Sequence, residues 1–170
     1  SKLIFAKFDD SEVNTYSFPK YINNGNMFPQ LEEIKYPKPG SFNPKVELYM
    51  LDLNSGLIAL INAMESAEGN WGEDYILYDA SWVGPNAFLF KISDRSSQKL
   101  IVRIYDTKNN TIKTMYTLDF KKFDGWVEKA RNVVPVPPME EKGRPEYGYL
   151  DILPDENGFN HIFYFARFSD

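Results

Sequence analysis

Apolar residues recur at every second position along much of this chain, the pattern of β-strands that bury one face. Residues 3–8 and 46–52 are two such runs. The second run ends in Asn-Ser-Gly at 54–56, and a further apolar run follows at 57–61. Two runs joined by such a turn predict a β-hairpin. A short helix over 57–67 is the alternative, because Ala, Leu, Met and Glu there are good helix formers.

Four more runs follow in close succession, at residues 75–82, 87–92, 99–106 and 111–118. Short polar turns join them, such as Gly-Pro-Asn at 84–86. Consecutive short strands joined by tight turns form an antiparallel meander, and a four-stranded meander is the unit of a β-propeller blade. We therefore expect one blade in the middle of the chain.

The same order of elements occurs three times along the sequence. An apolar strand is followed by an acidic turn and then by an apolar, aromatic strand, in the pairs 3–8 with 48–51, 88–92 with 100–105, and 149–153 with 162–165. The spacings between repeats, 106 − 52 = 54 residues from Asp52 to Asp106 and 164 − 105 = 59 from Tyr105 to Tyr164, are somewhat longer than the roughly 40–50 residues of compact propeller repeats. The predicted fold class is all-β, with about two to three four-stranded antiparallel blades in a partial ring.

The repeats divide the chain into blades. Residues 1–74 are expected to form part of a first blade, 75–122 a second, and 123–170 the start of a third. A blade needs a neighbour on each face, and a closed ring has about four to eight blades. We therefore expect the chain to be a segment of a larger ring, with unpaired strand edges at its ends.

A long arm is predicted inside the first blade, at residues 12–44. The alternation is lost there, and Asn, Pro, Tyr and Phe become frequent. The pattern favours an excursion with two irregular strands. A proline- and aromatic-rich arm between two strands of one blade has no packing role inside a ring.

Charge and composition exclude several classes of function. The formal net charge is −5 and both signs are mixed along the chain, so there is no basic face for nucleic acid. No run of eighteen apolar residues or signal-peptide pattern occurs. Cysteine is absent, which excludes a disulfide framework and a zinc-thiolate site. We expect no cofactor and no metal.

One Asn-x-Thr sequon is present, at Asn109-Asn110-Thr111. It lies in a turn-like stretch between two predicted strands. Such a motif accepts an N-linked glycan when the chain enters the secretory pathway. Asn109 is therefore a glycosylation candidate.

Residues 36–46 read Tyr-Pro-Lys-Pro-Gly-Ser-Phe-Asn-Pro-Lys-Val. This stretch resembles a signature of the dipeptidyl aminopeptidase family (dipeptidyl peptidase IV-like), in which Tyr-Pro-Lys-x-Gly-x-x-Asn-Pro-x-Val leads into a propeller strand. Asp-Ala-Ser-Trp at 79–82, Asp-Gly-Trp-Val at 124–127 and the strand 158–165 agree in order. The sequence at 91–97 is most similar to that of the fungal members of the family, of the dipeptidyl aminopeptidase A type.

The resemblance implies a parent that is a type II membrane-anchored serine peptidase of the Golgi or vacuole lumen. Its propeller would cap an α/β-hydrolase catalytic domain that releases dipeptides ending in Pro or Ala. The resemblance also implies a homodimer formed through the arm 12–44. The aromatic and aliphatic residues of that arm are the dimer candidates: Tyr16, Phe18, Tyr21, Phe28, Leu31, Ile34 and Tyr36.

The sequence offers no catalytic residue. A hydrolase of this kind needs a Gly-x-Ser-x-Gly elbow, which is missing, and the one histidine, His161, opens an aromatic strand where a structural role is expected. The acidic pairs 32–33 and 140–141 are interpreted as solvated charge, because the family's substrate-clamping carboxylates are expected upstream of Ser1. The acidic turn at 155–158 lacks the ligand pattern of a calcium loop. We predict no catalytic, substrate-binding or metal-binding residue.

Three hypotheses remain open from the sequence. The parent is an active exopeptidase, or it is a family member that keeps its propeller only for binding. The third is an independent ligand-binding β-domain, which would form a closed monomer.

Overall fold

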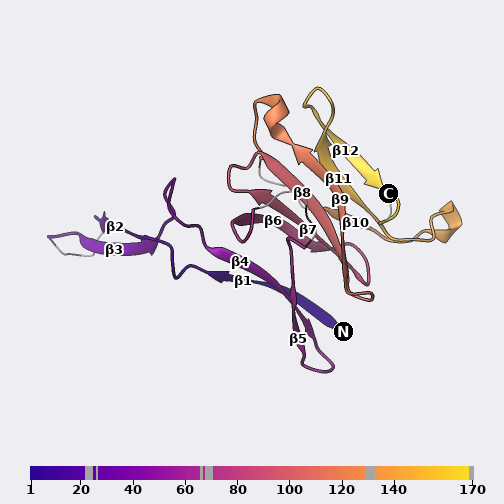
Figure 1. The fold of residues 1–170 in the computed structure, drawn as a ribbon, viewed down its shortest axis with the longest axis horizontal. Coiled ribbons are helices and arrows are strands. Elements are labelled where there is room, and N and C mark those ends of the chain that lie inside the picture. The colour runs from indigo at the N-terminus through magenta and orange to yellow at the C-terminus, as the bar shows by residue number, and fades with distance from the viewer. Residues whose placement is uncertain (22–24, 26, 66, 68–70, 129–132, 169–170) are drawn as a thin grey trace. The chain divides into compact units, whose positions relative to one another are not determined.

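The computed structural model describes residues 1–21, 25, 27–65, 67, 71–128 and 133–168. It forms two compact units, Ser1–Asn62 and Ala63–Asp170, which are considered separately (Figure 1). The strands are β1 (Lys2–Asp9), β2 (Thr15–Lys20), β3 (Gln30–Lys35), β4 (Lys45–Asp52), β5 (Ile58–Ile61), β6 (Tyr75–Trp82), β7 (Ala87–Asp94), β8 (Lys99–Asp106), β9 (Thr111–Asp119), β10 (Val134–Val136), β11 (Gly148–Pro154) and β12 (Asn160–Phe165). None of the described residues forms an α-helix.

The first unit contains an antiparallel sheet in the order β1-β4-β5. Phe5 of β1 lies opposite Tyr49 of β4, and their rings stack with centroids 5.6 Å apart. The carboxylate of Asp52 accepts the backbone N–H of Asn54 at 2.9 Å, and Gly56 adopts a positive φ of 73°. These contacts build the predicted turn between β4 and β5. The hairpin prediction is confirmed, and the alternative of a helix over 57–67 is wrong, because Ile58–Ile61 pairs with β4.

Strands β2 and β3 form a separate two-stranded sheet between β1 and β4 in the sequence. This hairpin lies within residues 12–44, for which we keep the name arm. Its ladder runs without interruption from the pair Thr15–Lys35 to the pair Lys20–Gln30. The prediction of irregular strands is therefore wrong, because the two strands keep one register along the whole ladder. Residues 22–24 and 26 of the predicted arm lie outside the described residues.

The second unit begins with a four-stranded sheet in the order β6-β7-β8-β9 (Figure 1). All three strand pairs are antiparallel and join consecutive strands, as the meander prediction requires. The register shifts between Leu77 and Asp79 on β6 and between Val102 and Arg103 on β8. Such bulges increase the local twist of a sheet and change the direction of side chains.

A second sheet of the same unit has the order β10-β11-β12. The chain reaches it through the 3-10 helix Phe120–Phe123, and another short 3-10 helix, Glu140–Lys142, lies between β10 and β11. Gly148 opens β11 where the strands approach closely, because an added Cβ would lie 2.4 Å from the backbone oxygen of Phe165. Only glycine fits at that point without a shift of backbone.

The core of the second unit lies between its two sheets. Val83, Ala87, Leu89, Leu100, Val102, Ile104, Val127, Val133 and Tyr149 form one buried apolar cluster. The six strands of the predicted repeat are present, and the structure shows that each apolar strand pairs with the aromatic strand of its repeat, as β1–β4, β7–β8 and β11–β12. The structure is therefore all-β and built from repeated antiparallel sheets, as predicted.

Candidate functional site

The one histidine of the chain, His161, lies near the start of β12 and pairs with Leu153 of β11. His161 places Nε2 3.3 Å from Oδ2 of Asp155, and its side chain is more than half exposed. The carboxylate of Asp155 also accepts the backbone N–H groups of Phe159 and Asn157, both at 2.9 Å. The hydrogen bond from Phe159, with smaller effects from Asn157 and His161, holds the pKa of Asp155 below its usual value. This arrangement stabilises a turn.

The two acidic pairs lie far from one another in the sequence and on different elements. On the arm, Glu32 forms an ion pair with Lys20 at 3.2 Å, and Glu33 accepts a hydrogen bond from Ser17 at 3.2 Å. Glu140 and Glu141 are exposed on the short 3-10 helix. Among the described residues, no cluster of three or more His, Asp or Glu side chains could hold a metal ion.

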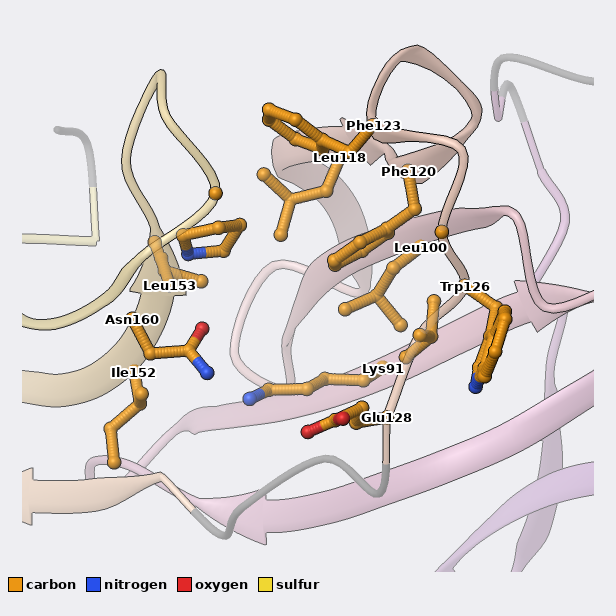
Figure 2. Close-up of a pocket in the computed structure, with 14 residues that line it drawn as sticks. Lys91, Leu100, Leu118, Phe120, Phe123, Trp126, Glu128, Ile152, Leu153 and Asn160 are labelled. Carbon is orange, nitrogen blue, oxygen red and sulfur yellow. The ribbon is translucent and has the colours of Figure 1, made fainter.

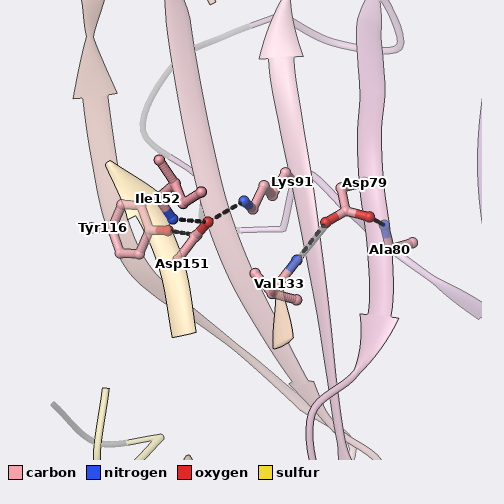
Figure 3. Close-up of polar contacts among 7 residues, drawn as sticks. All are labelled: Asp79, Ala80, Lys91, Tyr116, Val133, Asp151 and Ile152. Atoms are coloured by element: carbon pink, nitrogen blue, oxygen red, sulfur yellow. Dashed lines mark hydrogen bonds and ion pairs between the residues drawn. The ribbon is translucent and has the colours of Figure 1, made fainter. Parts of the chain in front are cut away.

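A buried polar cluster joins the two sheets of the second unit (Figure 3). Lys91 on β7 and Asp151 on β11 form an ion pair with Nζ and Oδ1 2.7 Å apart, and their side chains are 3% and 2% exposed. Tyr116 on β9 donates its hydroxyl hydrogen to the other carboxylate oxygen of Asp151. The backbone N–H of Ile152 donates to Oδ1 of Asp151 at 2.8 Å. One carboxylate thus accepts bonds from three elements.

Aromatic rings surround this cluster. Phe165 of β12 stacks on Tyr116 with centroids 5.5 Å apart and on Tyr149 with centroids 4.6 Å apart. Burial, and secondarily the nearby carboxylate of Asp151, raise the pKa of Tyr116 and of Tyr149 far above the usual value. Both hydroxyls therefore stay protonated over the whole physiological range. The hydroxyl of Tyr149 is buried without a hydrogen-bond partner among the described residues.

A second polar link ties β6 to the segment before β10. Asp79, at the bulge of β6, accepts the backbone N–H of Val133 at 3.4 Å and that of Ala80 at 2.8 Å (Figure 3). The Asp-Ala-Ser-Trp stretch singled out in the sequence therefore carries a structural contact between sheets. Trp82 of the same stretch packs edge-on against Phe88 of β7, with centroids 5.4 Å apart.

A further buried cation lies on β8. The guanidinium of Arg103 donates to the backbone oxygens of Ala63 and Glu65, each at 2.6 Å, and the residue is 1% exposed. Burial lowers the pKa of Arg103 from its usual value. Charge-assisted bonds to two carbonyls fix the chain before β6 against the sheet.

A pocket of about 290 Å³ opens between the two sheets, beside the polar cluster (Figure 2). Its walls are mainly apolar, and Lys91, Glu128 and Asn160 supply its charged or amide groups. Trp126 lies at its edge and is 66% exposed. The ammonium of Lys91 is held by Asp151, so it is not available as a base. Among the residues that the structure describes, the lining holds no serine, threonine or histidine that could act as a nucleophile or proton carrier.

Sequence reasoning missed Lys91, Asp151, Tyr116 and Arg103. Their signal is present, since Lys91 and Asp151 each interrupt a strand that is otherwise apolar. A charged residue at a buried position of a strand requires a partner, but a sequence does not say which strand supplies it.

The arm residues named as dimer candidates fall on two faces. Tyr16, Phe18, Ile34 and Tyr36 share one face of the β2–β3 ladder, because Tyr16 lies opposite Ile34 and residues two apart point the same way. Tyr16 packs against Phe18 and Tyr36, at 6.2 and 5.9 Å between centroids. Leu31 lies on the other face and is 74% exposed. Tyr21 and Phe28, outside the ladder, are also exposed.

The glycosylation candidate lies in the turn between β8 and β9. Asn109, Asn110 and Thr111 are all exposed. Asn109 donates a side-chain hydrogen to Asp106 at 2.6 Å.

No described segment is a helix long and apolar enough to cross a membrane.

The chain matches known proteins over almost its whole length. Dipeptidyl aminopeptidase A of Saccharomyces cerevisiae is 37% identical over 97% of this chain and 17% of its own length. Dipeptidyl aminopeptidase B of the same yeast is 34% identical over 97% of this chain and 20% of its own length. The chain therefore spans about a fifth of these relatives.

Solved structures show the same fold. A Bacteroides ovatus protein described as a dipeptidyl aminopeptidase IV matches with a TM-score of 0.70 at 17% identity, over 96% of this chain and 21% of its own. Porphyromonas gingivalis dipeptidyl peptidase 4 matches with a TM-score of 0.65 at 16% identity, with the same coverage. A family model described as the dipeptidyl peptidase IV (DPP IV) N-terminal region matches residues 1–169. The chain thus belongs to the dipeptidyl peptidase IV N-terminal region family, and its repeated antiparallel sheets form part of a β-propeller of that family.

Proposed function

We propose that this chain is the non-catalytic propeller segment of a serine exopeptidase that releases Xaa-Pro and Xaa-Ala dipeptides from free N-termini. The observation that carries the proposal is the similarity to yeast dipeptidyl aminopeptidases A and B across 97% of the chain. The parent is membrane-anchored, with this segment on the lumenal side of the Golgi or vacuole. An α/β-hydrolase domain elsewhere in the parent supplies the catalytic Ser-Asp-His triad.

The junction between the two sheets of the second unit supports a scaffold role. A buried ion pair, a tyrosine bond and stacked rings hold neighbouring blades together. A wall of fixed geometry suits a propeller that shapes the cavity through which short peptides reach a catalytic domain. Ile162 and Tyr164 are exposed, on the face of β12 opposite to Phe165, where a further blade of the parent would cover them.

The test of this proposal is hydrolysis by the full-length parent of chromogenic dipeptides with Pro or Ala at the second position. We expect turnover by the parent and none by the 170-residue chain alone. A parent that is folded and present at normal levels, yet inactive on both dipeptides, would show that its propeller serves binding only and would contradict the peptidase proposal.

We also propose that the arm forms a homodimer contact. A two-stranded hairpin is marginally stable by itself in water, so docking against another surface would stabilise it. The arm presents Tyr16, Ile34 and Tyr36 on one face, 42%, 39% and 51% exposed. Lys38 lies over the Tyr16 ring, with Nζ 4.6 Å from its centroid. A self-complementary apolar face is what a two-fold dimer requires.

Ile34→Asp in the full-length parent is expected to weaken the dimer by at least about tenfold, because it places a charge in the apolar contact. Sedimentation velocity over a dilution series measures the change. Thr15→Asp is the matched control, since it places the same charge on the opposite face of the same ladder. A dimer that survives Ile34→Asp but dissociates with Thr15→Asp would assign the contact to the other face and contradict this proposal.

A further inference from the structure

The turn between β8 and β9 has a defined geometry. The carboxylate of Asp106 accepts the backbone N–H of Lys108 at 2.8 Å and that of Asn109 at 3.3 Å. Asn110 then adopts the left-handed conformation, with φ of 55°. The hydroxyl of Tyr105 donates to the side-chain oxygen of Asn110 at 2.6 Å. These bonds fix the two asparagines in different environments.

The side-chain oxygen of Asn110 accepts the bond from Tyr105 of β8, whereas the side chain of Asn109 bonds to Asp106 within the exposed turn. Asn109 uses one hydrogen of its Nδ2 in the bond to Oδ2 of Asp106, at 2.6 Å. An amide nitrogen carries two hydrogens, so the second is left for substitution while the first keeps the bond to Asp106. Thr111, the third residue of the sequon, is exposed beside it.

We propose that Asn109 carries an N-linked glycan in the full-length protein. Nδ2 of Asn109 forms a bond to C1 of the first sugar of a lipid-diphosphate-linked oligosaccharide. The C1–O bond to the diphosphate breaks and its electron pair leaves with the diphosphate oxygen. One amide proton passes to a base of the transferase. The inference rests on the proposed function, because the transfer requires that this part of the parent enters the secretory lumen.

A glycan at Asn109 also identifies one end of the blade as solvent-facing in the full-length protein. The β8–β9 turn lies beside the β6–β7 turn, since the N–H of Thr107 donates to the backbone oxygen of Asn86 at 2.8 Å. The 3-10 helix Phe120–Phe123 lies at the other end of the blade, where the backbone N–H of Phe120 donates to the backbone oxygen of Gln98. A bulky, hydrated glycan does not fit inside a domain contact. The parent's other domains therefore leave the end at Asn86 and Thr107 uncovered.

The experiment uses the full-length parent made in a yeast host, with both glycosylation and dipeptide hydrolysis measured on the same preparation. After treatment with endoglycosidase H, mass spectrometry of the peptide that contains Asn109 should show one retained N-acetylglucosamine. Asn109→Gln should abolish that modification and leave hydrolysis of Xaa-Pro substrates unchanged. Thr111→Ser should retain the glycan and Thr111→Ala should lose it.

Asn110→Gly is the matched control, because it keeps both the sequon and the left-handed turn, so the glycan should remain on Asn109. An unmodified Asn109 peptide from an active parent that is glycosylated at other sequons would overturn this inference and leave the proposed function standing. A parent that lacks both glycans and dipeptidase activity would overturn the proposed function itself. Loss of hydrolysis in Asn109→Gln with normal folding would contradict the assignment of this end as solvent-facing.

Discussion

Asp151→Asn is expected to lower the free energy of local unfolding of the second unit by about 3–5 kcal/mol, the range for breaking one partner of a buried ion pair. The carboxylate lies 2.7 Å from the ammonium of Lys91, and both side chains are almost fully buried. Asparagine keeps the shape of the side chain but removes the charge that balances Lys91. The bond from Tyr116 also loses its charge assistance.

Native-state hydrogen exchange of the β7 and β11 amides in the full-length parent measures this change directly, without assuming that the whole parent unfolds in one step. Glu47→Gln is the control, because Glu47 pairs with Lys7 at 3.3 Å with both side chains largely exposed. An exposed pair of this kind contributes at most about 1 kcal/mol. Equal effects of the two substitutions would show that the Lys91–Asp151 pair does not hold the sheets together.

The sheets were predictable because their determinants are local. The alternation at 46–52 and the Asn-Ser-Gly turn specify β4, its turn and β5 within a short stretch of chain, and the structure has that hairpin. The meander at 75–118 was predictable for the same reason. The arm was predicted as irregular because the alternation of apolar and polar residues is lost there and prolines are frequent. Pro19, however, pairs with Leu31 in a regular two-stranded ladder, where each strand has a free edge that tolerates a missing N–H.

The polar junction was not predictable because its determinants are far apart in the sequence. Lys91 and Asp151 are separated by 60 positions, and nothing local to either residue indicates the other. The sequence shows only that each strand contains a charge where an apolar residue is expected. Which strands lie face to face is decided by the packing of the two sheets, and the partner follows from that packing.

The motifs that resemble the family carry structural contacts. The Asp79 stretch and the strand that begins near His161 carry contacts that fix blades and turns, through Val133 and Asp155. Family resemblance in this chain therefore reflects the geometry of a scaffold more than the chemistry of a reaction. A scaffold explains why the described pocket is lined by packing residues and an ion-paired lysine.

Tyr116→Phe is expected to destabilise the second unit and Tyr149→Phe is not, although both tyrosines stack on Phe165 beside Asp151. Tyr116→Phe removes a charge-assisted hydrogen bond to the buried carboxylate, which should cost about 1.5–3 kcal/mol. Tyr149→Phe removes a buried hydroxyl that has no partner among the described residues. Relief of that desolvation should stabilise the unit by about 1 kcal/mol or leave it unchanged.

The two substitutions control for one another, because each deletes a single oxygen atom and leaves an aromatic ring in the same stack. Hydrogen exchange of the β9 and β11 amides in the full-length parent compares them under one set of conditions. Combining Tyr116→Phe with Asp151→Asn should cost less than the sum of the separate effects, since both act on the same bond. Strict additivity in this double-mutant cycle would show that the Tyr116 hydroxyl does not stabilise the junction through its bond to the Asp151 carboxylate.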